Sequence, residues 1–142
     1  MNNSLARIRR LARLQAMGDS AARTSERAFA QAIADAANAA ARLSHIEGLI
    51  LTAAPLAIAG NGAALAAAAQ LRALLLPAAE MAESRLHSAV ANRSDAEARL
   101  VQSRARSRRL AEIVQEARTA STRHARQAEV EARPTPHNKA RS

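Results

Sequence analysis

Residues 75–128 carry mostly small or apolar side chains at alternating steps of three and four, the spacing of one face of a coiled-coil helix. The positions are Leu75, Ala79, Ala82, Leu86, Ala89, Arg93, Ala96, Leu100, Ser103, Ser107, Leu110, Val114, Ala117, Ser121, His124 and Ala128. The same alternation predicts an earlier helix with the face Phe29, Ile33, Ala36, Ala40, Leu43, Glu47 and Ile50. Composition agrees, since 40 alanines and 15 leucines favour helix, while a single phenylalanine and no other aromatic residue leave little bulk for a globular core.

The chain is expected to reverse once, near Asn61. Gly60 and Gly62 flank that residue and allow a tight turn, and Pro55 fits poorly inside a helix. Reflecting the chain about Asn61 places residue i opposite residue 122 − i, so that large side chains mostly face small ones. We therefore predict an all-α fold, a long antiparallel two-helix coiled-coil hairpin.

The predicted hairpin occupies residues 1–133, with a first arm over about 3–54, a turn over about 55–62 and a second arm over about 63–133. Gly18 is a weak break that we expect the first arm to continue through. Pro77 is expected to kink the second arm or to let a separate helix begin. Residues 134–142 have no apolar residue large enough to dock, so we predict a disordered tail.

Positive charge is concentrated in the two ends of the chain. Residues 1–27 carry a net charge of +4 and residues 85–142 a net charge of +7, whereas residues 28–84 carry −2. The hairpin would bring both basic ends together, which favours an acidic partner or another anionic surface. The candidate partner-binding residues of this basic end are Arg7, Arg10, Arg13, Arg104, Arg106, Arg108 and Arg109.

The middle of the chain is apolar, with no charged residue from Gly48 to Gln70. Each flank of the turn is shorter than the ~20 residues that a membrane span needs, and the Gly-Asn-Gly turn is costly in lipid. We expect this end to dock on a partner through Leu71, Leu74, Leu75 and Leu76, or to pack internally.

No constellation of catalytic or metal-binding residues is present in the sequence. The chain has no cysteine, the four histidines lack metal-type spacing, and no phosphate-binding loop or activated nucleophile occurs. We expect a protein that is not an enzyme and that has no cofactor, no metal and no small-molecule substrate.

The segment Ser107-Arg-Arg-Leu-Ala-Glu-Ile-Val-Gln-Glu-Ala-Arg118, followed by residues 123–133, resembles the C-terminal pattern of the FliJ family of flagellar type III export proteins. That family folds as one antiparallel hairpin with a longer C-terminal arm. The resemblance implies a stalk-like chaperone protein whose two terminal arms enter the export ATPase ring and regulate the ATPase. It also implies that the far end faces the membrane export gate.

Two other readings remain open, a self-associating structural coiled coil and a basic helical protein that binds nucleic acid or an anionic membrane surface. The arginine-rich segments lack the aromatic and lysine support typical of nucleic-acid binding, so we expect no nucleic-acid partner. The N-terminus lacks the apolar core of a secretory signal. We expect a bacterial cytoplasmic protein that is at most peripheral at the inner membrane.

Overall fold

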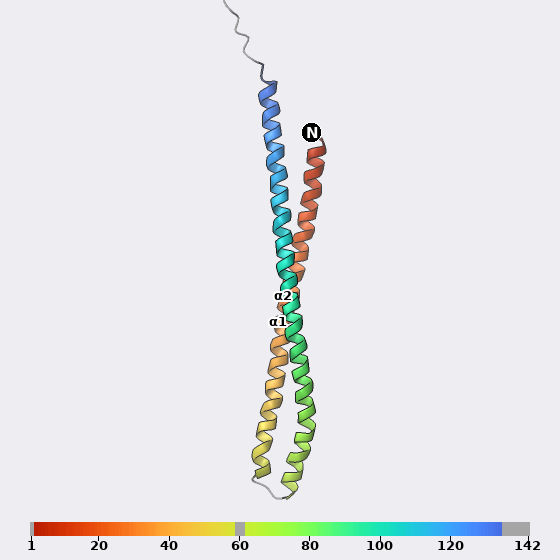
Figure 1. The fold of residues 1–142 in the computed structure, drawn as a ribbon, viewed down its shortest axis with the longest axis vertical. Coiled ribbons are helices and arrows are strands. Elements are labelled where there is room, and N and C mark those ends of the chain that lie inside the picture. The colour runs from red at the N-terminus through yellow and green to blue at the C-terminus, as the bar shows by residue number, and fades with distance from the viewer. Residues whose placement is uncertain (1, 59–61, 135–142) are drawn as a thin grey trace, which may run out of the picture. The chain divides into compact units, whose positions relative to one another are not determined.

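The computed structural model describes residues 2–58 and 62–134, and within them the chain forms two long helices and no strand. Helix α1 spans Asn2–Ile58 and helix α2 spans Gly62–Ala132. The two helices run antiparallel and pack against each other, so the predicted all-α hairpin is confirmed (Figure 1). Abundant alanine, leucine and arginine explain why helices this long form.

The hairpin divides into two compact units, which we describe separately. The terminal unit consists of Met1–Arg23 and Gln102–Ser142, and the hairpin unit consists of Thr24–Val101. Each unit therefore contains a segment of α1 packed against a segment of α2.

Helix α1 ends later than the sequence predicts, and neither Gly18 nor Pro77 interrupts a helix. Its bounds reach Ile58, four residues beyond the predicted end of the first arm. It runs through Gly18, as expected, and α2 runs through Pro77, so no separate helix begins there. Strong helix formers surround both positions and outweigh the local cost of glycine or proline. The predicted turn centre, Asn61, and the tail residues 135–142 lie outside the described residues.

The predicted face of α2 packs against α1. Its positions from Leu75 to Ser121 are buried or half-buried, apart from Arg93, which is exposed. Leu100 and Val114 are among the most buried side chains of the protein, at 5% and 2% exposure. His124 and Ala128 are exposed, because α1 begins at Asn2 and covers little of this part of α2.

The predicted face of α1 is correct at every second position and off by one at the others. Phe29, Ala36, Leu43 and Ile50 are buried or half-buried, as expected, whereas Ile33, Ala40 and Glu47 are exposed. The intervening contacts are made by the preceding residues, Ala32, Ala39 and Ile46. Alanine replaces the bulkier Ile33 at the interface because a small side chain lets two helices approach closely.

The register of the terminal unit also differs from the simple reflection about Asn61. That reflection places Gly18 opposite Arg104, but a Cβ built on Gly18 would lie 3.8 Å from the Cα of Ser107. A hydrogen bond at the next residue supports the same pairing, because Ser107 Oγ donates to Asp19 Oδ1. The helices of this unit are thus offset by about one turn from the predicted pairing.

Most of the buried residues are small. The buried hydrophobic residues are Ala22, Ala32, Ala36, Ala53, Ala68, Ala82, Leu100 and Val114. No large side chain of the described residues is fully buried. The hairpin is therefore held together by close contact along a narrow interface, and large side chains remain available on its surface.

Candidate functional site

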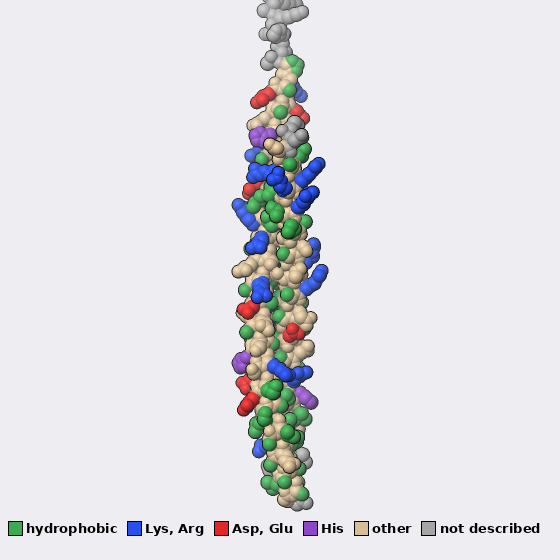
Figure 2. All heavy atoms as spheres, turned by 90° about the vertical axis from the view of Figure 1, so that its right-hand side faces the viewer, with side chains coloured by type: hydrophobic (Ala, Val, Ile, Leu, Met, Phe, Trp, Pro, Cys, Tyr) green, Lys and Arg blue, Asp and Glu red, His purple; other side chains and the backbone are tan. Residues whose placement is uncertain are grey.

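The predicted basic residues all lie on the surface of the terminal unit. We call this set the arginine collar, and each of its members is exposed: Arg7, Arg10, Arg13, Arg104, Arg106, Arg108 and Arg109. The described part of the unit carries thirteen arginines against five acidic residues. Basic side chains project along it in Figure 2. The hairpin unit carries six arginines against seven acidic residues, so the excess positive charge of the described chain lies in the terminal unit.

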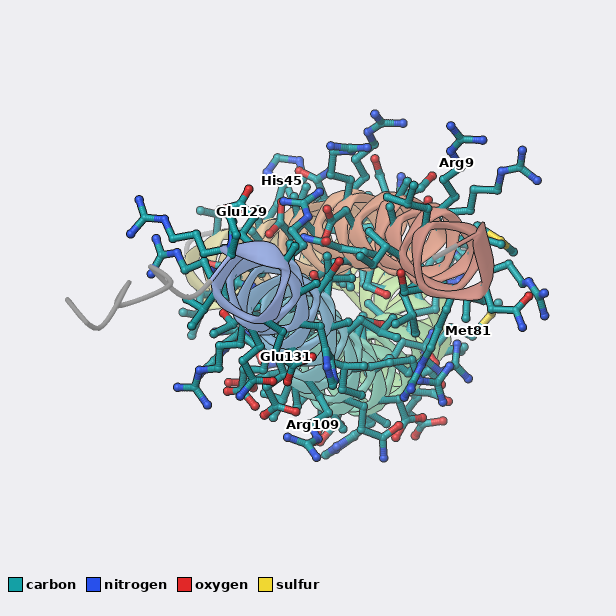
Figure 3. All side chains as sticks on the ribbon, turned by 90° about the horizontal axis from the view of Figure 1, so that it is seen from above. Arg9, His45, Met81, Arg109, Glu129 and Glu131 are labelled. Carbon is teal, nitrogen blue, oxygen red and sulfur yellow. The ribbon has the colours of Figure 1, made fainter. Side chains whose placement is uncertain are left out.

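The arginines point to several sides of the terminal unit. Seen along the helices, Arg9 of α1 and Arg109 of α2 project outward on opposite sides (Figure 3). The sequence explains this spread, because successive residues of a helix are rotated by about 100°. Arg104 and Arg106 therefore point away from each other, and the same holds for Arg7 and Arg9. A partner that contacts the whole set must reach around both helices.

The arginines of the two helices are staggered along the terminal unit. The sequence prediction places Arg13 opposite Arg109. The backbone of Ser107 lies opposite Gly18 and not opposite Gln15, which shifts the two basic runs past each other by about one turn. The basic runs of α1 and α2 belong to the same unit but lie at different positions along the helix axes. This stagger reduces the repulsion between the two runs, since it increases the distance between their charges.

Few of these arginines are neutralised within the protein. Arg109 Nη1 forms an exposed ion pair with Glu112 Oε2 at 3.2 Å. Arg104 also makes a polar or electrostatic interaction within the protein. Within residues 2–58 and 62–134, Arg7, Arg10 and Arg13 form no ion pair. Their positive charge faces solvent and is available to a partner.

The leucines predicted to dock lie in the hairpin unit and divide into two groups. Leu71, Leu74 and Leu76 are exposed, at 41%, 73% and 53%. Leu75 is half-buried at the interface with α1, so it belongs to the packing of the hairpin. Three of the four leucines are therefore on the surface and one is packed internally, and docking through the exposed three stays a prediction.

Three further exposed leucines near the connection between α1 and α2 were missed by the sequence reasoning. Leu49, Leu51 and Leu65 are exposed at 41%, 72% and 53%. All three lie in the uncharged stretch that the sequence identifies. Leu49 and Leu51 lie outside the face of α1 that packs against α2, so the correct phase of that face would have predicted their exposure. A small groove of about 210 Å³ separates the two helices in this region and is lined by Ala53, Ala64, Ala67, Ala68 and Leu71.

The described residues form no group of three or more His, Cys, Asp and Glu side chains suited to hold a metal ion. His87 Nε2 lies 4.0 Å from Glu83 Oε1, one turn away on the same exposed face of α2. The grooves between the helices are shallow and lined largely by alanine and surface polar residues. The arrangement thus presents two distinct surfaces, one basic and one apolar.

No protein-family model matches this chain, and no curated protein or solved structure with which it was compared matches it either.

Proposed function

We propose that this protein is a non-enzymatic coiled-coil component of a flagellar type III protein export apparatus. In this proposal the terminal unit enters the export ATPase ring as a stalk, and the hairpin unit reaches toward the membrane export gate. The proposal rests on the sequence resemblance to the FliJ family and on the distribution of charge over the two units.

The observation that carries the proposal is the arginine collar. Arginines on several sides of one helix pair suit a partner that surrounds the pair, such as the acidic lumen of a ring. A flat partner or a nucleic-acid groove would leave many of them without a contact. Exposed ion pairs contribute about 0–1 kcal/mol each, so many weak contacts could hold a stalk that also turns.

The apolar surface of the hairpin unit supports the second half of the proposal. Leu71 and Leu74 share one side of α2 and Leu76 projects from another side, and exposed apolar side chains of this kind are typical of protein–protein contacts. We assign these three residues to the contact with the export gate.

The test is a charge reversal in the terminal unit. Changing Arg104, Arg106, Arg108 and Arg109 together to Glu should weaken binding to the export ATPase by at least about tenfold and abolish stimulation of ATP hydrolysis. The matched control changes Arg42, Arg85, Arg93 and Arg99 of the hairpin unit to Glu and should retain binding. Circular dichroism should show that both variants remain helical.

Two results would overturn the assignment. One is undiminished ATPase binding by the reversal in the terminal unit. The other is micromolar binding of RNA or DNA at physiological salt, with an affinity that falls steeply as salt increases. That result would favour a basic nucleic-acid-binding protein.

A further inference from the structure

Within the terminal unit, helix α1 carries a second line of side chains at heptad spacing, separate from the line that packs against α2. We call it the outer stripe, and its members alternate in steps of three and four: Arg7, Arg10, Leu14, Met17 and Ala21. Successive residues of a helix are rotated by about 100°, so these five lie within about 80° of one another. All five are exposed, with Leu14 at 48% and Met17 at 68%.

The outer stripe points about a quarter turn away from the packed side of α1. That packed side shows the same alternation, and its members are buried or half-buried: Ile8, Leu11, Gln15, Gly18 and Ala22. A helix with two lines of side chains at heptad spacing can pack against two neighbours, one along each line. Helix α2 is the first neighbour in this unit, and the exposure of the outer stripe leaves the second position open.

The outer stripe combines positive charge with apolar surface. Arg7 and Arg10 form no ion pair within residues 2–58 and 62–134. Asp19 is the one acidic residue in the α1 part of the unit, and its carboxylate is directed to α2, where it accepts a hydrogen bond from Ser107. The complementary surface therefore needs carboxylates for the arginines and apolar side chains for the leucine and the methionine.

We propose that the outer stripe is the docking face for an acidic amphipathic helix of a partner protein. In the complex, apolar side chains of the partner pack on Leu14, Met17 and Ala21, and its carboxylates pair with Arg7 and Arg10. As an account of how a stalk contacts the ring around it, the inference rests on the proposed function and specifies the surface that the ring presents to α1.

Two other occupants fit the outer stripe less well. A second copy of the chain would bring together two terminal units, in each of which thirteen arginines outnumber five acidic residues in the described part, and such units repel each other. A nucleic acid would offer phosphates to the arginines but would leave Leu14 and Met17 without an apolar partner. The combination of charge and apolar surface favours a protein helix.

The probe is a synthetic peptide of three heptads with leucine at positions a and d and glutamate at positions e and g, where like charges oppose its self-association. It carries a fluorophore, and its anisotropy is measured on titration with the full chain. We expect saturable binding. A second peptide with alanine in place of the leucines keeps the charge and the helix propensity, and it should bind at least about tenfold more weakly.

Substitutions in the chain locate the apolar contact. Leu14→Gln combined with Met17→Gln should weaken binding of the leucine peptide at least about tenfold. The matched control combines Leu5→Gln with Val130→Gln, two exposed apolar residues of the same unit outside the outer stripe, and should bind like the unchanged chain. Circular dichroism should show that both variants remain helical.

A second pair of variants separates a specific contact from attraction by net charge. Arg7→Gln combined with Arg10→Gln should weaken binding of the leucine peptide about tenfold. Arg9→Gln combined with Arg23→Gln removes the same charge from other sides of α1 and should weaken binding less than twofold.

The position of the bound peptide is mapped with single introduced cysteines, since the chain has none of its own. The bound peptide should shield Ala21→Cys from alkylation by a maleimide. It should leave Ala16→Cys reactive, because this exposed alanine lies on another side of α1.

Several results would overturn the proposal: equal binding of the two peptides, equal losses from the two arginine pairs, or no shielding at residue 21. Tighter binding of duplex DNA than of the leucine peptide would also overturn it, as would dimers of the chain that the changes at Leu14 and Met17 abolish. The peptide requires no export protein, so the two proposals fail separately. A chain that binds the peptide but no export ATPase counts against the proposed function alone, and the reverse result counts against the docking face alone.

Discussion

Gly18 of α1 lies directly against Leu110 of α2, and a Cβ on Gly18 would come within 2.8 Å of Leu110 Cδ1. Glycine at this position lets the two helices of the terminal unit approach closely. Gly48, which is also helical, differs sharply, because a Cβ there would meet nothing within 4 Å. The two glycines form a matched pair in which one position is crowded and the other is open.

Replacing Gly48 with Ala should raise the free energy of unfolding by about 0.5–1 kcal/mol, the usual gain in helix propensity. Gly18→Ala should gain less, because the Leu110 side chain has to move aside. The larger Gly18→Val should lower the free energy of unfolding by about 1–3 kcal/mol through overpacking. Urea denaturation followed by circular dichroism measures all three. Equal gains for the two alanine variants would show that Leu110 exerts no constraint.

The register of the terminal unit predicts a specific cross-link. With Gly18 and Ser107 both changed to Cys, oxidation should form a disulfide, because the Cβ of residue 18 lies 3.8 Å from the Cα of Ser107. The comparison pair joins Gly18→Cys to Arg104→Cys, the partner that reflection about Asn61 would select, and it should stay reduced. Gel mobility without reductant distinguishes the two pairs. Faster oxidation of the second pair would restore the simple reflection.

The fold could be predicted from the sequence because helix propensity and the three-four alternation point to the same answer over most of the chain. The register could not, since an interface of repeated alanine and serine fits about as well after a shift of one turn. The α1 face was misassigned at Ile33 because hydrophobicity favours isoleucine over alanine, while close packing favours Ala32.

The position of the basic surface could be predicted from the sequence, because charged side chains stay in water, and every residue of the arginine collar is exposed. Exposure of individual leucines could not be read, because it depends on the phase of each helix. Leu75 lies at the interface while its neighbours Leu74 and Leu76 are exposed, a difference set by rotations of about 100°.

The excess positive charge of the terminal unit predicts a response to salt. Raising KCl from 50 to 500 mM should increase the thermal midpoint by a few degrees, because screening weakens repulsion among exposed arginines. Changing Arg104, Arg106 and Arg108 to Gln should reduce this response. The same change at Arg85, Arg93 and Arg99 should leave it intact, since acidic residues balance the arginines of the hairpin unit. A midpoint independent of salt in the unchanged protein would contradict the prediction.

Pro77 lies inside α2, where its ring and its missing N–H weaken the helix. Pro77→Ala should raise the free energy of unfolding by about 3 kcal/mol, because it restores a hydrogen bond to the carbonyl of Ala73 and removes a steric clash. Ser94→Ala, at an exposed position of the same helix, provides the control and should gain only about 0.5 kcal/mol. Similar gains from both changes would mean that α2 already accommodates the proline without cost.

An interface built from alanine has a thermodynamic consequence for how this protein melts. The heat capacity change of unfolding grows with the apolar area that unfolding exposes, and six of the eight buried hydrophobic residues are alanines. That heat capacity change should therefore be small for a chain of 142 residues. Its enthalpy of unfolding then varies little with temperature, and its stability curve is shallow, with cold denaturation shifted far below the freezing point of water.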